Sequence, residues 1–373
     1  MSLNRFLSTR NGTKKWRIAA AVVLSGASIS ATAQSSVTLF GSLDAGVTYI
    51  SNQGGQRNAR FDDGIYAPNL LGLQGSEDLG GGTRAVFLLL SQFTLANGSL
   101  LPSQGLFGRT AYAGLDNDDL GQLTFGEQYD FMNDALLFPF NDTAMYIGGP
   151  YNFRAGPFTA LALPGNPTGN FNWDRAGVAL PNTVKYRSPS VQGFRLGAMY
   201  GFRSTAGSGE PDRSHSVGLT YDRYAFGAAL AYTAMTYPGT IGQTTVRNWG
   251  IGAHYNVDSL RLSTVYTGVS NSANGARIGS LQAGALYRLT PAVSFGMDYM
   301  YMKGNAVLGS NHAHQVTSTL LYALSKRTNV YVEGVLQRTN AGAHALISNI
   351  LDANGASSNS AQSLVRIGFQ TAF

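Results

Sequence analysis

The sequence predicts an all-β fold: a 16-stranded antiparallel transmembrane β-barrel with short periplasmic turns, long extracellular loops and an inward-folded third loop. Three observations support this. The amino terminus has the features of an export signal, the rest of the chain alternates apolar with small or polar residues, and the last strand ends on Phe373. An amphipathic last strand with an aromatic end is typical of outer-membrane barrels, because it must pair with the first strand and meet lipid outside.

The amino terminus has the three parts of a secretory signal peptide. Its basic region lacks acids, an apolar run follows at 18–29, and Ala31-Thr32-Ala33 forms a small-x-small cleavage site. The apolar run is about 12 residues long, whereas a spanning helix needs roughly 20. We therefore expect residues 1–33 to be removed, which leaves a barrel domain at 34–373. The basic residues of the signal are Arg5, Arg10, Lys14, Lys15 and Arg17.

Composition excludes several classes of protein. Of the 26 basic residues, 21 remain after signal removal against 20 acids, so there is no charge argument for binding nucleic acid. No apolar segment of about 20 residues follows the signal, which argues against a helical membrane protein. The absence of cysteine means that no disulfide stabilises the exported chain.

From residue 35 onward, alternating segments are separated by turns of two sizes. Asp, Asn, Gly, Pro and Ser dominate the short turns, as tight hairpins require. Seven short turns and eight long connections join sixteen strands, and the first (36–50) and last (362–373) close the ring. The short turns lie at 78–82, 116–121, 188–193, 222–224, 258–259, 289–292 and 325–328; the long connections lie at 51–67, 93–107, 129–181, 204–214, 236–246, 269–279, 304–312 and 339–361.

The alternation assigns the two faces of each strand. Phe295, Met297 and Tyr299 share one side, and Gly296 and Asp298 share the other. We expect the apolar side to meet lipid and the small or charged side to face the lumen. A ring of sixteen strands is too wide for side chains to fill, so the lumen should hold water.

The connection 129–181 carries almost no strand pattern. An irregular loop of about 50 residues in a compact domain is usually functional. Inside so wide a barrel, we expect it to fold inward as a constriction. Asp130 and Asp134 open the loop and are the predicted acids of that constriction; capping of the loop's first turns is the alternative role.

The basic residues after the signal are 18 arginines and 3 lysines. Guanidinium groups stay charged and orient as rigid forks, which suits fixed charges on a pore wall. Loop carboxylates opposite wall bases would create a transverse field that orders polar solutes. We predict Lys185, Arg187 and Arg366 to line the pore, and Arg84 and Arg288 to lie at the periplasmic rim. By strand parity the inward-facing bases are Arg84, Lys185, Arg187, Arg195, Arg261, Arg288 and Arg366.

Several segments resemble one family across the whole mature chain. The opening Ser36-Val37-Thr38-Leu39-Phe40-Gly41, the run 72–82, Phe107-Gly108-Arg109, Asn182-Thr183-Val184-Lys185-Tyr186 and the ending Arg366-Ile367-Gly368-Phe369 resemble trimeric Gram-negative porins of the beta-proteobacterial type. The resemblance implies a homotrimer in the outer membrane, with a water-filled channel for passive diffusion of small hydrophilic solutes and ions. It also implies an eyelet where loop acids face wall arginines, with Arg109 at the position of a wall arginine. The last strand is the expected contact with the barrel-assembly machinery.

Some positions depart from the family pattern. The family usually has bases at the positions of Leu70 and Gln74 and an acid at that of Leu90, and arginines are common at the positions of Glu127 and Ala179. Neutral or apolar groups thus replace several lumen charges. The departures argue against strong anion selectivity and favour a pore for larger or less polar solutes, while the sign of selectivity stays open.

Catalytic alternatives find little support. The five histidines are scattered, and Gly80-Gly81-Gly82 reads as a hairpin rather than a phosphate loop because no helix follows it. We predict no catalytic residue, no metal and no cofactor. A passive channel is the leading interpretation. A solute-specific channel, an outer-membrane barrel enzyme and an adhesive barrel with a blocked lumen remain as alternatives.

Overall fold

The protein is described by a computed structural model. It covers residues 36–101, 105–137, 149–152, 154–164, 171, 179–203, 211–238, 242–347 and 355–373, so the predicted signal at 1–33 lies outside the described residues. Residues 34–373 form one compact unit. No helix in the described ranges is both long and apolar enough to cross a membrane.

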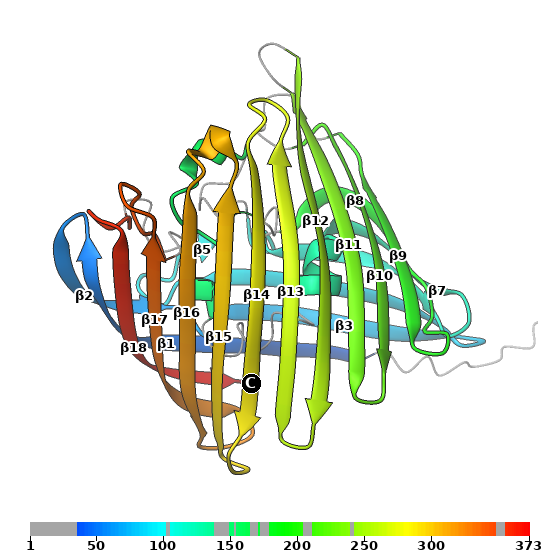
Figure 1. Cartoon of the computed structure of the whole chain (residues 1–373). Coiled ribbons are helices and arrows are strands. Elements are labelled where there is room, and N and C mark those ends of the chain that lie inside the picture. Colours follow the sequence, from blue (N-terminus) through cyan, green and yellow to red (C-terminus); the bar gives the residue numbers. More distant parts are fainter. Residues whose placement is uncertain are drawn as a thin grey trace, which may run out of the picture. The chain divides into compact units, whose positions relative to one another are not determined.

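The described residues contain eighteen β-segments in one closed antiparallel sheet (Figure 1). β1 (Ser36–Gln53) pairs with β2 (Gln56–Asp63) along one part and β3 (Leu70–Gly80) along another, so β2 and β3 share one strand position. β5 (Leu100–Leu101) and β6 (Thr110–Asn117) likewise share a position beside β4 (Thr83–Phe93). The ring therefore has sixteen positions, and β1 closes it on β18 (Ala361–Ala372). The predicted 16-stranded barrel is confirmed.

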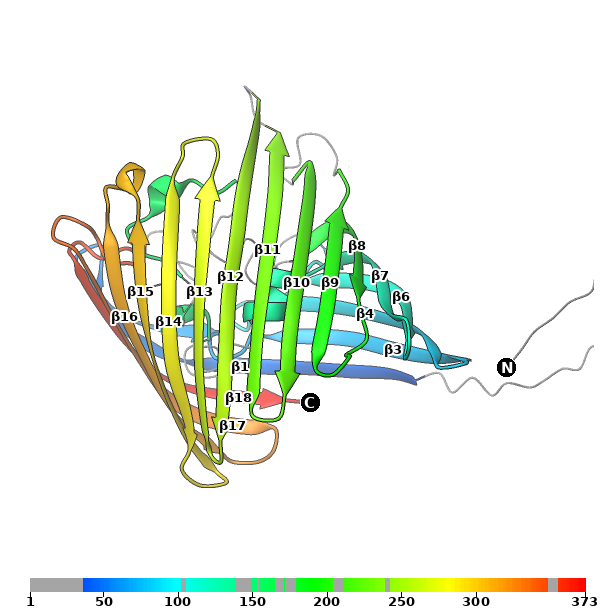
Figure 2. The ribbon, with the colours of Figure 1, turned by 45° about the vertical axis from the view of Figure 1, so that its right-hand side comes forward.

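The remaining strands follow one another around the ring in chain order (Figure 2). They are β7 (Gly121–Gln128), β8 (Leu180–Arg187), β9 (Phe194–Gly201), β10 (Arg213–Arg223), β11 (Phe226–Pro238), β12 (Gln243–Val257), β13 (Leu260–Asn271), β14 (Arg277–Arg288), β15 (Val293–Gly304), β16 (His312–Ala323) and β17 (Thr328–Thr339). Short hairpins join them at one end and longer connections at the other, as the turn residues predict.

One predicted connection is mostly strand. The segment 51–67 was expected to be a long loop, but it contains β2, which pairs with the end of β1. A tight turn at Gly54 and Gly55 makes this hairpin possible, because both residues have positive φ angles of 62° and 95°. β2 carries only two apolar residues, the outward Ala59 and Phe61, and its inward Arg60 and Asp62 form an ion pair at 2.8 Å, so its alternation is too short to mark a strand in the sequence.

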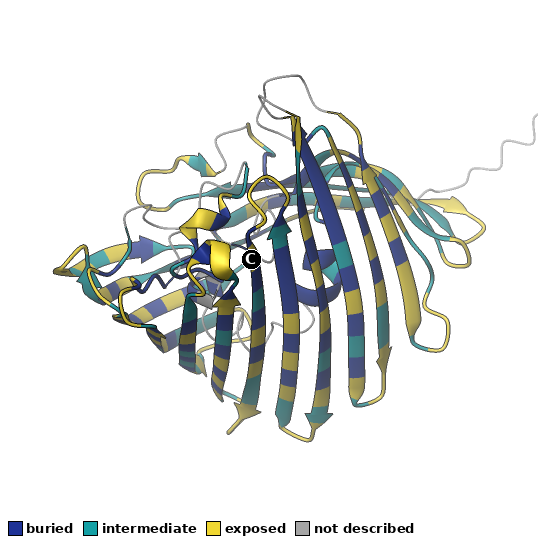
Figure 3. Ribbon diagram, turned by 45° about the horizontal axis from the view of Figure 1, so that its top comes forward, coloured by how far each residue is buried: buried dark blue, intermediate teal, exposed yellow. Residues whose placement is uncertain are grey.

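Exposure alternates along the strands as the sequence predicts (Figure 3). In β15 the outward Met297 and Tyr299 are 50% and 43% exposed, whereas the inward Asp298 and Met300 are buried at 2% and 0%. The apolar face therefore lies on the outside of the barrel. A water-soluble protein buries its apolar residues inside, and the opposite arrangement seen here is stable in lipid because the surrounding solvent is apolar.

The main buried cluster lies on the inside of the wall. Three short helical turns of the third loop, η1 (Met132–Leu137), η2 (Gly149–Asn152) and η3 (Thr159–Leu161), contribute to the two buried clusters together with inward strand residues. A further turn, η4 (Ala306–Leu308), lies between β15 and β16. The described parts of the third loop thus fold inward, where they pack on the barrel wall.

Candidate functional site: a constriction built by the third loop

The first part of the third loop rests on glycines of the barrel wall. The Phe131 ring lies directly over Gly197 and Gly218, where a Cβ atom would come within 2.0 and 2.8 Å of the ring. Leu136 lies in the same way over Gly250, at 2.8 Å from the position of a Cβ. We call residues 131–137 the loop turn. Any side chain larger than hydrogen at these glycines would push the loop turn off the wall.

Asp130 caps the loop turn and is buried. Its carboxylate accepts hydrogen bonds from the Asn133 backbone N–H and Nδ2, both at 3.0 Å, and from Thr233 Oγ1 at 2.6 Å. Burial raises the pKa of Asp130, and the hydrogen bonds from Thr233 and Asn133 oppose that rise. The structure therefore gives Asp130 the capping role that was the alternative, and its 2% exposure differs from the expected lumen-facing acid.

Asp134 joins the loop turn to two wall bases. Its Oδ2 lies 2.6 Å from Lys185 Nζ and 3.5 Å from Arg187 Nη1. Lys185 also donates to the Tyr129 carbonyl at 2.5 Å and lies 4.9 Å from the centre of the Phe131 ring. Arg187 has the most accessible side chain of the three, at 39%. The structure thus brings together three of the predicted site residues, from loop and wall.

A hollow of about 190 Å³ lies against this charged cluster. Its other side consists of inward residues of β4 and β6, chiefly Leu88, Leu90 and Tyr112, with Gln122 and Thr124 from β7. Leu88 pairs in register with Gln74 on β3, so both side chains lie on the inner face of the wall. Charged groups therefore face an apolar strip across the space beside the loop turn.

Arg109 enters this region from the start of β6. It is buried to 7% exposure, its guanidinium donates to Gln92 Oε1, and it lies 5.8 Å from the centre of the Tyr129 ring. Because Tyr129 immediately precedes the capping Asp130, Arg109 supports the base of the loop turn.

Arg366 lies away from the channel surface, contrary to the predicted pore-lining position. Its side chain is 0% exposed and contacts Asp44 at 3.1 Å, Thr48 Oγ1 at 3.0 Å and Tyr331 Oη at 2.9 Å. The cause is the loop, since Tyr151 covers this cluster by hydrogen bonding to Thr48 at 3.0 Å. Strand parity places Arg366 on the inner face correctly, but it cannot show that the loop lies on top of it.

The later part of the loop is fixed to the opposite wall by polar side chains. Arg154 donates to Ser280 Oγ at 3.2 Å and to Gln282 Oε1 at 2.7 Å. Burial lowers the pKa of Arg154, and the nearby Asp298 opposes that effect. Backbone carbonyls of the loop accept from inward amides: Gln315 to Tyr151, Gln337 to Ala155, and Asn271 to Leu161 and Ala162.

These anchors were not anticipated from the sequence. The sequence does contain the residues that hold the loop, namely glycines and side-chain amides in β9, β10, β12 and β13–β17. The strand pattern already places these residues on the lumen side. A wet lumen would not require glycine at Gly197 and Gly218. An aromatic ring packed directly on the wall requires glycine at both positions.

Comparison with known proteins gives a consistent result. The protein family described as Gram-negative porin matches residues 19–342. Outer membrane porin protein 32 of Delftia acidovorans is 28% identical over 96% of this chain and 100% of that protein. An outer membrane porin protein of Bordetella pertussis is 27% identical over 86% of this chain and 93% of that protein.

Solved structures show the same fold. The anion-selective porin from Comamonas acidovorans has a TM-score of 0.75 at 23% identity, covering 91% of this chain and 100% of that one. The trimer form of OmpT from Vibrio cholerae has a TM-score of 0.64 at 12% identity, covering 91% of this chain and 99% of that one.

Proposed function

This chain belongs to the Gram-negative porin family and forms an outer-membrane channel for passive diffusion, and we propose that this channel is narrowest between the loop turn and the inner wall of β4 and β6. The observation that carries the proposal is the Asp134 carboxylate, held between Lys185 and Arg187 opposite Leu88 and Tyr112. Fixed charges on one side of a narrow, low-dielectric passage act strongly on passing ions.

In this proposal the predicted site residues divide into two groups. Arg187 and Asp134 act on solutes in the constriction, the buried Lys185 adds its charge and holds Asp134, and Arg109 holds Tyr129 at the edge. Asp130 and Arg366 keep the loop in place, because both are buried in hydrogen bonds beneath it. We propose that the chain acts as a channel alone and catalyses no reaction.

The constriction should favour anions weakly. Two wall bases face one loop acid, and Arg195, exposed on the adjacent β9, adds a further positive charge. The absence of bases at Leu70 and Gln74 limits this preference. The Comamonas structure is described as anion-selective, which agrees in sign.

An apolar strip beside two bases also favours a second candidate, a channel that prefers amphiphilic anions. Leu88, Leu90 and Tyr112 would contact the apolar part of the solute, and Lys185 and Arg187 its charged group. In liposomes, Leu88→Ser should then lower the permeability ratio of benzoate to acetate. An unchanged ratio would leave general diffusion as the function.

We propose that the channel is a homotrimer joined through β3, β4 and β6. Exposed tyrosine and tryptophan residues mark the membrane interface on the outside of β9 and β12–β16, but the described outward positions of β3, β4, β6 and β7 carry neither residue. The outward Leu71 and Leu115 are nevertheless 41% and 50% exposed. An apolar face without interfacial aromatics suits contact with another copy. Chemical cross-linking through cysteines placed at these two positions would test it. On β9 and β12–β16 these residues are Tyr200, Trp249, Tyr255, Tyr266, Tyr287, Tyr299 and Tyr322; Tyr49 on β1 and Tyr186 on β8 are also exposed.

Export and insertion complete the proposal. Residues 1–33 would direct secretion and be removed, which amino-terminal sequencing of the outer-membrane protein would show. The barrel-assembly machinery would engage β18. Phe373 supports that role, because its backbone exchanges hydrogen bonds of 3.1 and 3.2 Å with Gly41 of β1.

Phe131→Ala tests the position of the constriction. Without its ring the loop turn loses its contact with Gly197 and Gly218, so single-channel conductance in planar bilayers should rise. Phe125→Ala is the matched control, because Phe125 lies on the adjoining β7 but points outward with 52% exposure. Equal conductance in both variants would place the bottleneck elsewhere.

A further inference from the structure

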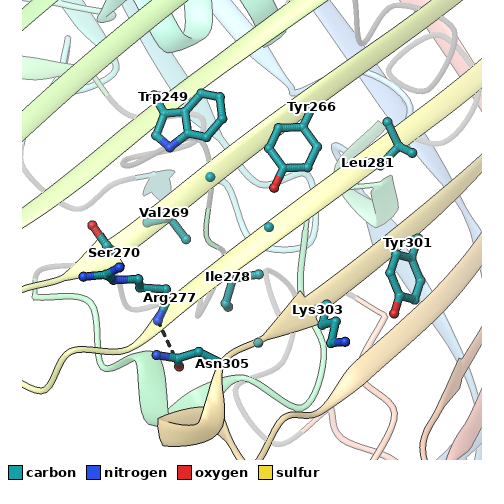
Figure 4. Close-up of a pocket in the computed structure, with 13 residues that line it drawn as sticks. Trp249, Tyr266, Val269, Ser270, Arg277, Ile278, Leu281, Tyr301, Lys303 and Asn305 are labelled. Carbon is teal, nitrogen blue, oxygen red and sulfur yellow. Dashed lines mark hydrogen bonds between the residues drawn. The ribbon is translucent and has the colours of Figure 1, made fainter.

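The outer wall of the barrel carries a hollow of about 610 Å³ over β12–β15, near the long connections (Figure 4). Gly268 and Gly279 pair in register on β13 and β14, and their lack of side chains lets neighbouring aromatic rings lie against the wall at the floor of this hollow. The Trp249 and Tyr266 side chains lie flat over these glycines, within 2.6 and 2.5 Å of where a Cβ would be. Leu281 completes an apolar floor. The hollow falls in the range of about 300–1,000 Å³ that is typical of small-ligand sites.

Two basic side chains stand at the edge of this hollow toward the long connections. Arg277 and Lys303 both line it, both are exposed, and Figure 4 shows them on either side of Ile278. Lys303 pairs in register with Gly279, and Arg277 is two residues from Gly279 on the same face of β14. The site is therefore amphipathic, with aromatic and aliphatic groups toward the membrane interior and two cations toward the outer surface.

No acid balances these cations on the outside of the wall. Within the described strands β12–β17 the only acids are Asp298 and Glu333, and both face inward. Two further exposed bases, Arg247 and Arg338, point outward at the same end. Bases in a membrane interface attract anionic head groups, and a guanidinium binds phosphate through two parallel hydrogen bonds.

We propose that this groove binds a phosphorylated lipid of the outer leaflet. An acyl chain lies on the Trp249, Tyr266 and Leu281 floor, and the phosphate lies between Arg277 and Lys303. The groove lies across the ring from β3, β4 and β6, so it stays open to lipid in the proposed trimer. Lipid binding here is independent of conduction, because none of these side chains faces the lumen.

The test uses Trp249 as a reporter. With Trp173 replaced by Phe, Trp249 is the only tryptophan after residue 33. The protein is reconstituted in phosphatidylcholine vesicles that contain a minor fraction of either brominated phosphatidic acid or brominated phosphatidylcholine, whose bromines quench tryptophan. Brominated phosphatidic acid should quench at about a thirtyfold lower fraction, as expected from two favourable basic contacts at the membrane surface.

Arg277→Gln with Lys303→Gln should abolish this preference and leave single-channel conductance unchanged, which also shows that the variant is folded. Arg223→Gln with Arg327→Gln, at the short-turn end, removes the same charge and should keep the preference. Millimolar inorganic phosphate should not displace the lipid. Equal quenching by the two lipids, a preference that survives in the first variant, or displacement by free phosphate would each overturn the proposal.

Discussion

Replacing Arg187 by Gln removes one positive charge from the constriction while Asp134 stays paired with Lys185 at 2.6 Å. An ion that passes the exposed guanidinium at about 7 Å in water interacts with it by about 0.6 kcal/mol. In 0.1 M salt the screening length of about 10 Å halves this to about 0.3 kcal/mol. Because anions lose this attraction and cations lose an equal repulsion, the anion-to-cation permeability ratio should fall about threefold.

The assay is the reversal potential across a planar bilayer with a salt gradient. At 1 M salt the screening length is about 3 Å, so the change should shrink to about 1.2-fold. Arg277→Gln is the matched control, because it removes the same charge from the outer wall and should leave the ratio unchanged. A ratio that does not change in 0.1 M salt, or that changes equally in both variants, would refute the assignment of Arg187 to the constriction.

Three further predictions follow from burial and pairing. Ile251→Arg, on the lipid face near the middle of β12, should lower the free energy of unfolding in bilayers by about 2–4 kcal/mol. Gln74→Arg, at an inward and exposed position, should lower it far less and should increase the preference for anions. Equal losses of unfolding free energy in urea titrations would contradict the assigned faces. Deleting Phe373 should reduce the amount of heat-modifiable protein in the outer membrane, since the pairing with Gly41 closes the ring. Normal amounts on semi-native gels would exclude this role. Burial raises the pKa of Asp130 above its usual 3.8, so the stability that it adds is complete below that pH and declines as pH rises through the raised value. The amide oxygen of Asp130→Asn can accept the same hydrogen bonds, so this variant should keep the loop turn and the wild-type conductance. An increase in its single-channel conductance would show that the ionised carboxylate is required.

The strand pattern predicts the barrel closely, because a strand between lipid and lumen must alternate. The alternation fixes which face of each strand meets lipid, and the structure closes β1 on β18 as expected. β2 was missed because its alternation is short. Only Ala59 and Phe61 are apolar on its outer face, between the inward Arg60 and Asp62 and the polar residues of the turn.

The constriction was predicted only in part. The sequence predicts an inward loop that begins with acids. In the structure one of these acids, Asp134, forms ion pairs with Lys185 and Arg187 on the wall. Parity cannot tell whether an inward residue meets water or the loop, so it does not reveal that Arg366 lies beneath the loop. The position of Asp130 at the start of the loop likewise does not reveal that its side chain is buried as a cap. Gly250 shows the same limit, since parity places it on the inner face but not beneath Leu136, where it lies. Contacts between inward glycines and side chains of the loop join residues that are far apart in the sequence, so the strand pattern does not reveal them.

Single-channel conductance of a loop deletion tests the central claim most directly. Removing residues 150–169 takes away the segment whose Tyr151, Arg154 and Leu161 are fixed to the inner wall. If the third loop narrows the channel, the deleted protein should conduct more than the wild type and admit larger solutes in liposome-swelling assays. Unchanged conductance and an unchanged solute limit, in a protein that still folds to its heat-modifiable form, would mean that the loop does not define the channel's narrowest point.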